Sequence, residues 1–184
     1  GYGVADAAEV KRVIDRVLGY ISQNTPAYVV DSRTGKPVDD LDKIDSHSRL
    51  AQGAFRLTSY EWGVTYSAVQ AAYHATGDKA YRDYAYDRMG LLAKAAPRFK
   101  AAAKGGAVAD RLMRRVLTPG SLDDCGAICS AMIKARLDGA DLPLDSLIAN
   151  YFNFIANKEH RLADGTFARL RPYRNSVWLD DMFM

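Results

Sequence analysis

Three acidic residues of the chain stand where they could carry out acid–base chemistry. They are Glu61, Asp124 and Asp180, each expected at the start of a helix. A carboxylic acid can donate a proton to a reacting atom or take one from water, which is the chemistry of many hydrolases. The dipole of a helix also favours an acid in its first turn, so residue type alone does not separate a catalytic role from a structural one.

Two of these acids belong to an internal repeat. Residues 61–68 and 124–131 both read acid, one residue, glycine, three residues, Ser-Ala. Asp180 follows after a similar interval, without the glycine. Repeats of this period indicate stacked helical hairpins. We therefore expect three hairpins around an axis, with Glu61, Asp124 and Asp180 at one common rim.

Aromatic residues accompany the acids. Tyr60 and Trp62 flank Glu61, and Trp178 precedes Asp180. Indole and phenol rings stack on sugar faces while carboxylates bind sugar hydroxyls, so the combination is typical of a sugar-binding cleft. The alternative is that Tyr60 and Trp62 are ordinary core aromatics.

The elements that must position these residues are predicted to be helices, from apolar periodicity and from Gly, Pro and Asp turn signals. In order they cover about residues 10–25, 59–75, from 79 on, 108–117, 122–137, 144–157 and 176 onward. The helix that starts at 79 is expected to be broken by Pro97 and by Gly105-Gly106. An irregular polar loop is expected over 28–57. Asp164-Gly165 predicts the one β ribbon, over 161–170.

Composition limits the function classes. A net charge of +3 with 26% charged residues offers no nucleic-acid footprint, and no apolar run is long enough to span a membrane. Cys125 and Cys129 share a helix face, but no histidine has the spacing to complete a zinc site with them, so we expect two small buried residues. The sequence predicts one domain without a metal or an organic cofactor, and it leaves the bacterial cytoplasm and periplasm both open.

Several segments together resemble the unsaturated uronyl hydrolases of glycoside hydrolase families 88 and 105, the second more closely. The matching segments are YEWG (60–63), YxxTGDxxY (73–81), LDDCG (122–126), DGTF (164–167), RxRP (169–172) and WLDDMFM (178–184). Their order and spacing fit from about residue 10 to the end. The terminal segment is the most specific of them.

This resemblance implies an all-α (α/α)6 toroid of six helical hairpins. The chain supplies about three hairpins, so we expect a single domain that is the N-terminal half of the barrel, completed by a missing C-terminal half or a second chain. The implied activity removes a terminal 4,5-unsaturated uronic acid from oligosaccharides left by a polysaccharide lyase, such as rhamnogalacturonan fragments of pectin. The implied roles are general acid/base for Asp180, its partner for Asp124, and the lining of the sugar site for Tyr60, with Trp62 beside it.

Some assignments stay open on the residues alone. Asp124 could instead form a capping box with Ser121, and only one of Asp180 and Asp181 should face a pocket. Arg169 or Arg171 could bind the uronate carboxylate with a bidentate fork, or could simply pair with surface acids. The rival to the enzyme hypothesis is a non-catalytic half-toroid that serves as a carbohydrate-binding or protein-interaction scaffold.

Overall fold

The computed structural model of the chain describes residue 3 and residues 6–183, so Met184 of the terminal motif lies outside the described residues. The helices are α1 (Ala7–Asn24), α2 (Tyr60–Thr76), α3 (Lys79–Ala102), α4 (Arg111–Leu117), α5 (Leu122–Leu137), α6 (Asp145–Asn157) and α7 (Leu179–Phe183). Strands β1 (Val29–Asp31) and β2 (Ser48–Leu50) form an antiparallel pair, and a 3-10 turn covers Leu41–Lys43. The predicted all-α class, a partial six-hairpin toroid, is confirmed.

Two helical hairpins form the body of the molecule. In the first, α2 ends at Gly77 in the left-handed conformation, and Asp78 accepts a hydrogen bond from the Ala80 N–H to begin α3. Glycine adopts that conformation without a Cβ penalty, which is why the chain reverses there. In the second hairpin, α5 and α6 are joined through Gly139, which also has a positive φ.

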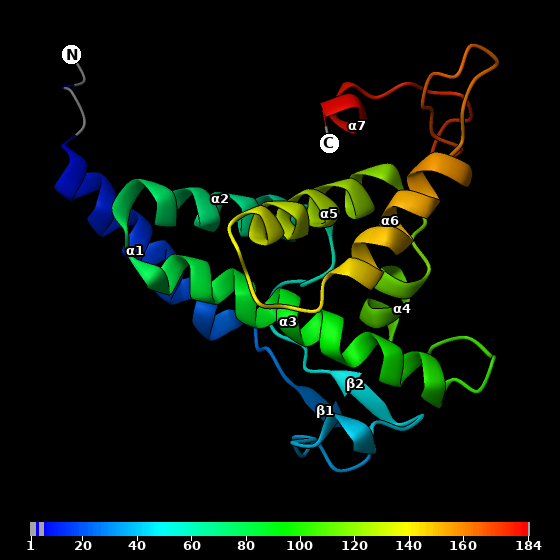
Figure 1. Ribbon diagram of the computed structural model, residues 1–184, viewed down its shortest axis with the longest axis horizontal. Helices are drawn as coiled ribbons and strands as arrows, with labels where there is room; N and C mark the ends of the chain where they lie inside the picture. The colour runs from blue at the N-terminus through cyan, green and yellow to red at the C-terminus, as the bar shows by residue number, and fades with distance from the viewer. Residues whose placement is uncertain (1–2, 4–5, 184) are drawn as a thin grey trace.

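Helices α2 and α5 pack side by side and run in the same direction (Figure 1). A Cβ on Gly63 would lie 2.5 Å from the backbone of Ala127, so only glycine permits this close approach. Further along, the Gln70 side-chain amide donates to the carbonyl oxygen of Ala131. The two copies of the sequence repeat therefore open two parallel neighbours, with their N-terminal turns at one end.

The core lies between this parallel pair and the helices that cover it, α3, α4 and α6. Its largest fully buried residues come from every layer and include Tyr66, Tyr81, Met89, Leu92, Met113, Ile128, Met132 and Tyr151. The β1–β2 lobe is tied to this body by Asp110, which caps α4 and accepts the Leu50 N–H at 3.0 Å. Among the described residues, no helix is long and apolar enough to cross a membrane.

Helix α1 has the predicted apolar stripe, but much of the stripe faces solvent. Val10, Val13 and Val17 are 45%, 40% and 50% exposed, and Ile21 is the residue of the helix that is buried. Ile14, Leu18 and Ile21 attach the helix to the core, and Asp15 adds a hydrogen bond from the Tyr81 hydroxyl. Amphipathic periodicity predicts a face that can pack, without saying whether a partner is present to cover it.

Two predicted features of secondary structure were wrong. Helix α3 does not break at Pro97 but continues to Ala102, because the neighbouring Ala93, Ala96 and Phe99 are buried and offset the one lost backbone hydrogen bond.

The predicted ribbon at 161–170 is a short hairpin without regular strands and is not the one ribbon of the described chain. An antiparallel bridge joins Arg161 to Phe167, with backbone hydrogen bonds from Leu162 to Thr166 and from Ala168 to His160. The two-stranded sheet of the described chain is β1–β2, inside the segment predicted to be an irregular loop.

Candidate active site

Arg169 joins the first turns of α5 and α7. Its Nε and Nη2 donate to the two carboxylate oxygens of Asp181 at 2.5 and 2.6 Å, and Nη2 also donates to Asp123 at 2.9 Å. Asp181 is only 7% exposed. This is a bidentate pair with a second acid on the same cation, a geometry that fixes both turns relative to each other.

Asp124 reaches from α5 to the neighbouring helix α2. Its Oδ1 accepts the Tyr60 N–H at 2.8 Å, and its Oδ2 accepts from Arg115 at 3.0 Å. The alternative of a capping box with Ser121 is wrong, since the Ser121 side chain makes no capping hydrogen bond and the carboxylate is engaged elsewhere. The first N–H groups of a helix lack partners within it, so Asp124 caps α2 from outside.

Asp180 and Asp181 point in different directions, as neighbours on a helix must. Asp180 is exposed, and its Oδ1 accepts the Asp181 N–H at 3.1 Å. Trp178 lies just before them, with the Arg169 guanidinium 4.1 Å from its ring centre. The terminal motif thus holds one acid inside an ion pair and leaves the other, Asp180, facing outward.

The predicted aromatic residues have different surroundings. Tyr60 is exposed at the N-terminus of α2, near the Asp124 carboxylate. Trp62 is 7% exposed, stacks on Phe55 with ring centres 4.7 Å apart, and donates its N–H to the Tyr84 hydroxyl. Its ring therefore contacts the core and not the rim.

Glu61, the third acid of the predicted rim, is exposed and pairs with Arg56 at 3.7 Å. A hydrogen bond from the Ser59 hydroxyl lowers the pKa of Glu61. The Asp124 carboxylate accepts the N–H of Tyr60, the residue before Glu61, so the acids of α2 and α5 do lie at the same end of the molecule.

A cavity of about 440 Å³ adjoins the Arg169 cluster, between the first turn of α5, the end of α6 and residues 169–171. Arg171 lines it, and among the described residues its side chain has no hydrogen-bond or ion-pair partner within the chain. Arg169 lines the same cavity but is already engaged by two carboxylates. Of the two arginines predicted to bind a substrate carboxylate, Arg171 is the one with unused donors.

The surroundings of Asp123 and Glu159 shift the pKa values of these two carboxyls in opposite directions. Burial raises the pKa of Asp123, but hydrogen bonds from Ser121 and the Asp124 N–H, together with Arg169, outweigh burial and leave that pKa lowered. For Glu159, burial and then the charges of Asp181 and Asp123 raise the pKa. Neighbouring acids with pKa values moved in opposite directions are a common property of catalytic sites.

Sequence reasoning missed Asp123, Glu159 and Arg115. Asp123 was within reach, because it stands beside Asp124 in the matched LDDCG segment. Nothing in the local pattern marks Glu159 or Arg115. Within the described part of the chain, no group of three or more His, Cys, Asp or Glu is arranged to hold a metal ion.

Comparison with protein families matches residues 13–184, almost the full length of the chain, to a family of glycosyl hydrolases. The chain is a member of Glycosyl Hydrolase Family 88. None of the curated proteins compared with it matches significantly. Membership in Glycosyl Hydrolase Family 88 supports a glycosidase and gives no support to the non-catalytic scaffold. The closer resemblance to family 105 stays a prediction.

Proposed function

We propose that the protein removes a terminal 4,5-unsaturated uronic acid from lyase-generated oligosaccharides, with rhamnogalacturonan fragments as the expected substrate class. The observation that carries the proposal is the meeting of two acidic helix turns, LDD at 122–124 and WLDD at 178–181, through Arg169. Membership of a glycosyl hydrolase family supports hydrolysis in general. The substrate itself is our inference.

The chemistry starts from a vinyl ether, in which the C4=C5 double bond is conjugated to the ring oxygen. We assign to Asp180 the proton transfer to C4, which leaves positive charge on C5 and the ring oxygen. Water then adds at C5 as Asp180 takes back a proton, and the resulting hemiketal opens and releases the rest of the oligosaccharide. One water is consumed, and no carboxylate attacks C1, unlike ordinary glycoside hydrolysis.

The other predicted site residues have supporting roles in this proposal. Asp124 stabilises the developing cation and holds a sugar hydroxyl, and exposed Tyr60 offers a ring beside it. Arg171 binds the uronate carboxylate through its unused donors. Trp62 supports this site from the core, through its packing on Phe55.

We also propose that further helical hairpins complete the toroid, because the family's barrel has six and this chain has about three. The functional test therefore uses the longest natural form of the protein. Unsaturated oligosaccharides from a rhamnogalacturonan lyase are compared with saturated ones of the same length. We expect loss of the double bond's ultraviolet absorbance and release of the shortened oligosaccharide. Equal cleavage of saturated substrates would contradict the proposal.

A further inference from the structure

Glu159 is a titratable group of this site that the proposed mechanism does not use. It stands two residues beyond the end of α6, at the cavity beside the Arg169 cluster. Its Oε1 accepts the His160 N–H at 3.2 Å. Its Oε2 is shielded from solvent and has no hydrogen-bond partner among the described residues.

The charges around Glu159 do not compensate an ionised carboxylate. The charges of Asp181 on α7 and Asp123 on α5 raise its pKa, and the smaller effect of the His160 charge lowers it. Arg169, which lies between the two aspartates, already gives its Nε and Nη2 hydrogen bonds to them. The cations Lys158 and Arg171 line the same cavity, yet within the described chain neither forms an ion pair with Glu159.

The unpartnered oxygen decides which protonation state fits. An ionised carboxylate with one oxygen buried and without a donor loses hydration that nothing replaces. A neutral carboxyl avoids that loss and needs only an acceptor for its O–H. Burial is the largest cause of the raised pKa of Glu159, the His160 N–H opposes it, and Asp181 and Asp123 add to it. The nearby thiol of Cys125 is itself buried, with its pKa raised, and so adds no charge.

We infer that Glu159 keeps its proton to higher pH than an ordinary glutamate, and that in this protonated form the carboxyl turns toward the adjoining cavity and donates a hydrogen bond to an oxygen of the bound sugar. The inference rests on the proposed function for the identity of the ligand only. The protonated state stands on the chain's own geometry. Glu159 is then a substrate-binding residue whose donor is lost when it ionises.

The protonated state is tested without substrate. The chain has three glutamates, Glu9, Glu61 and Glu159, so glutamate labelled with ¹³C at the side-chain carboxyl gives three signals. The signal that disappears in Glu159→Gln belongs to Glu159. We expect it to titrate above the usual glutamate range and to move to lower pH in Asp181→Asn. Titration within or below the usual range in the wild type overturns the inference.

The donor role is tested through the pH dependence of KM for an unsaturated oligosaccharide. Wild-type KM should rise about five- to tenfold as pH passes through the Glu159 titration, the effect of losing one hydrogen bond. Glu159→Gln keeps an N–H donor and should have a low KM that does not change over this range, while Glu159→Ala should have a high KM throughout. The same pH dependence in Glu159→Gln as in the wild type overturns the role. If the wild type turns over no unsaturated substrate, the proposed function fails instead, and the carboxyl titration still decides the protonated state.

Discussion

At the first turns of α5 and α7, four aspartates have three kinds of surroundings. Asp123 and Asp181 share Arg169, Asp124 caps α2, and Asp180 faces outward. The contacts of Asp123, Asp181 and Asp124 hold the turns in place, and the Asp124 carboxylate is still 27% exposed, which leaves it room to meet a sugar hydroxyl as well. Our mechanism takes the assignment of the proton transfer to Asp180 from the resemblance, and the exposure of this carboxylate leaves it free to meet a substrate.

Replacing the Asp124 side chain should weaken the start of α2. Asp124→Ala removes the acceptor for the Tyr60 N–H and the partner of Arg115, so we expect the free energy of unfolding to fall by about 1–2 kcal/mol. Asp124→Asn keeps an oxygen acceptor and should cost less. Chemical denaturation measures both changes. Equal losses in the two variants would show that the cap contributes nothing.

The Arg169 cluster should make stability depend on pH. The folded-state pKa of Asp123 is lowered, so its contribution is present above the unfolded pKa of about 3.9 and is lost as pH falls through the folded value. In Arg169→Gln the free energy of unfolding should therefore fall less as the pH is lowered than it does in the wild type. Denaturation between about pH 5 and pH 2 measures it.

Lys158→Gln is the control for Arg169→Gln, since it removes a cation from the same cavity without touching the Asp123 pair. Glu159 acts in the opposite sense. Its folded pKa is raised, so its contribution is lost as pH rises. Because both variants retain Glu159, comparing how their stability falls at acid pH isolates the contribution of the aspartates paired with Arg169. If the unfolding free energy of Arg169→Gln fell between about pH 5 and pH 2 as steeply as that of Lys158→Gln, this account would be contradicted.

At the scale of elements, the parallel pair α2–α5 depends on one close contact. Gly63→Ala places a Cβ 2.5 Å from the Ala127 backbone, and backbone cannot move aside cheaply. We expect a loss of about 1–3 kcal/mol in the free energy of unfolding, the usual cost of overpacking.

Gly19→Ala is the matched control for Gly63→Ala. Gly19 also lies inside a helix, α1, and a Cβ there meets nothing within 4 Å. Alanine should stabilise the chain at that position by about 0.5–1 kcal/mol through helix propensity. Thermal and chemical unfolding of both variants give the comparison. Stabilisation by Gly63→Ala would mean that the two helices do not pack through this glycine.

The sequence predicted these elements correctly where their ends or packing depend on residues close together in the chain. The predicted helix ends near residues 75 and 137 agree with the ends of α2 and α5, where Gly77 and Gly139 have a positive φ. The repeat that contains Gly63 predicted two equivalent helices, and α2 and α5 do pack side by side. The continuation of α3 through Pro97 depends on tertiary burial, which no local pattern contains. The same holds for strands β1 and β2, which are three residues each and pair across a long loop.

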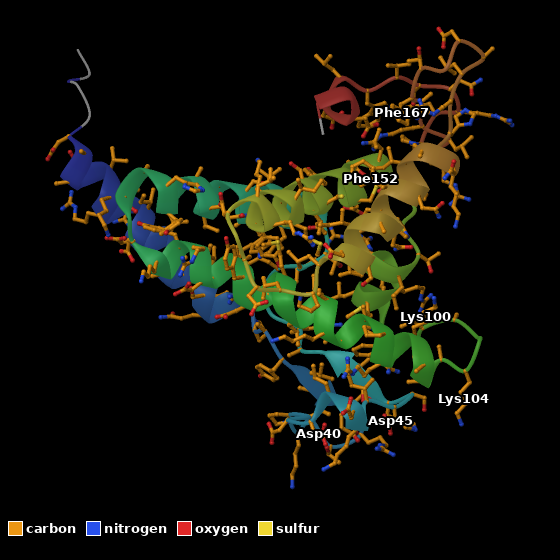
Figure 2. The ribbon with its side chains drawn as sticks, viewed as in Figure 1. Asp40, Asp45, Lys100, Lys104, Phe152 and Phe167 are labelled. Carbon is orange, nitrogen blue, oxygen red and sulfur yellow. The ribbon has the colours of Figure 1, made fainter. Side chains whose placement is uncertain are left out.

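At the scale of the whole molecule, the candidate site lies at one end. Figure 2 shows Phe167, from the segment that follows α6, at the opposite end from Asp40 and Asp45 of the β1–β2 lobe. The sequence predicted which segments would gather at the rim. It did not predict which cation each acid pairs with. Arg169 and Asp123 are 46 positions apart, and their pairing depends on the folded geometry.

The most direct test of the central assignment compares wild type with Asp180→Asn in the longest natural form of the protein, on a lyase-generated unsaturated oligosaccharide. The rate at which the double bond's ultraviolet absorbance disappears is measured at equal enzyme concentration. Asp180 is exposed and in no ion pair among the described residues, so the fold should be unaffected. We predict a rate loss of about 10²–10⁴-fold, the usual contribution of a general acid. Asp180→Asn with a rate close to that of the wild type would contradict the account.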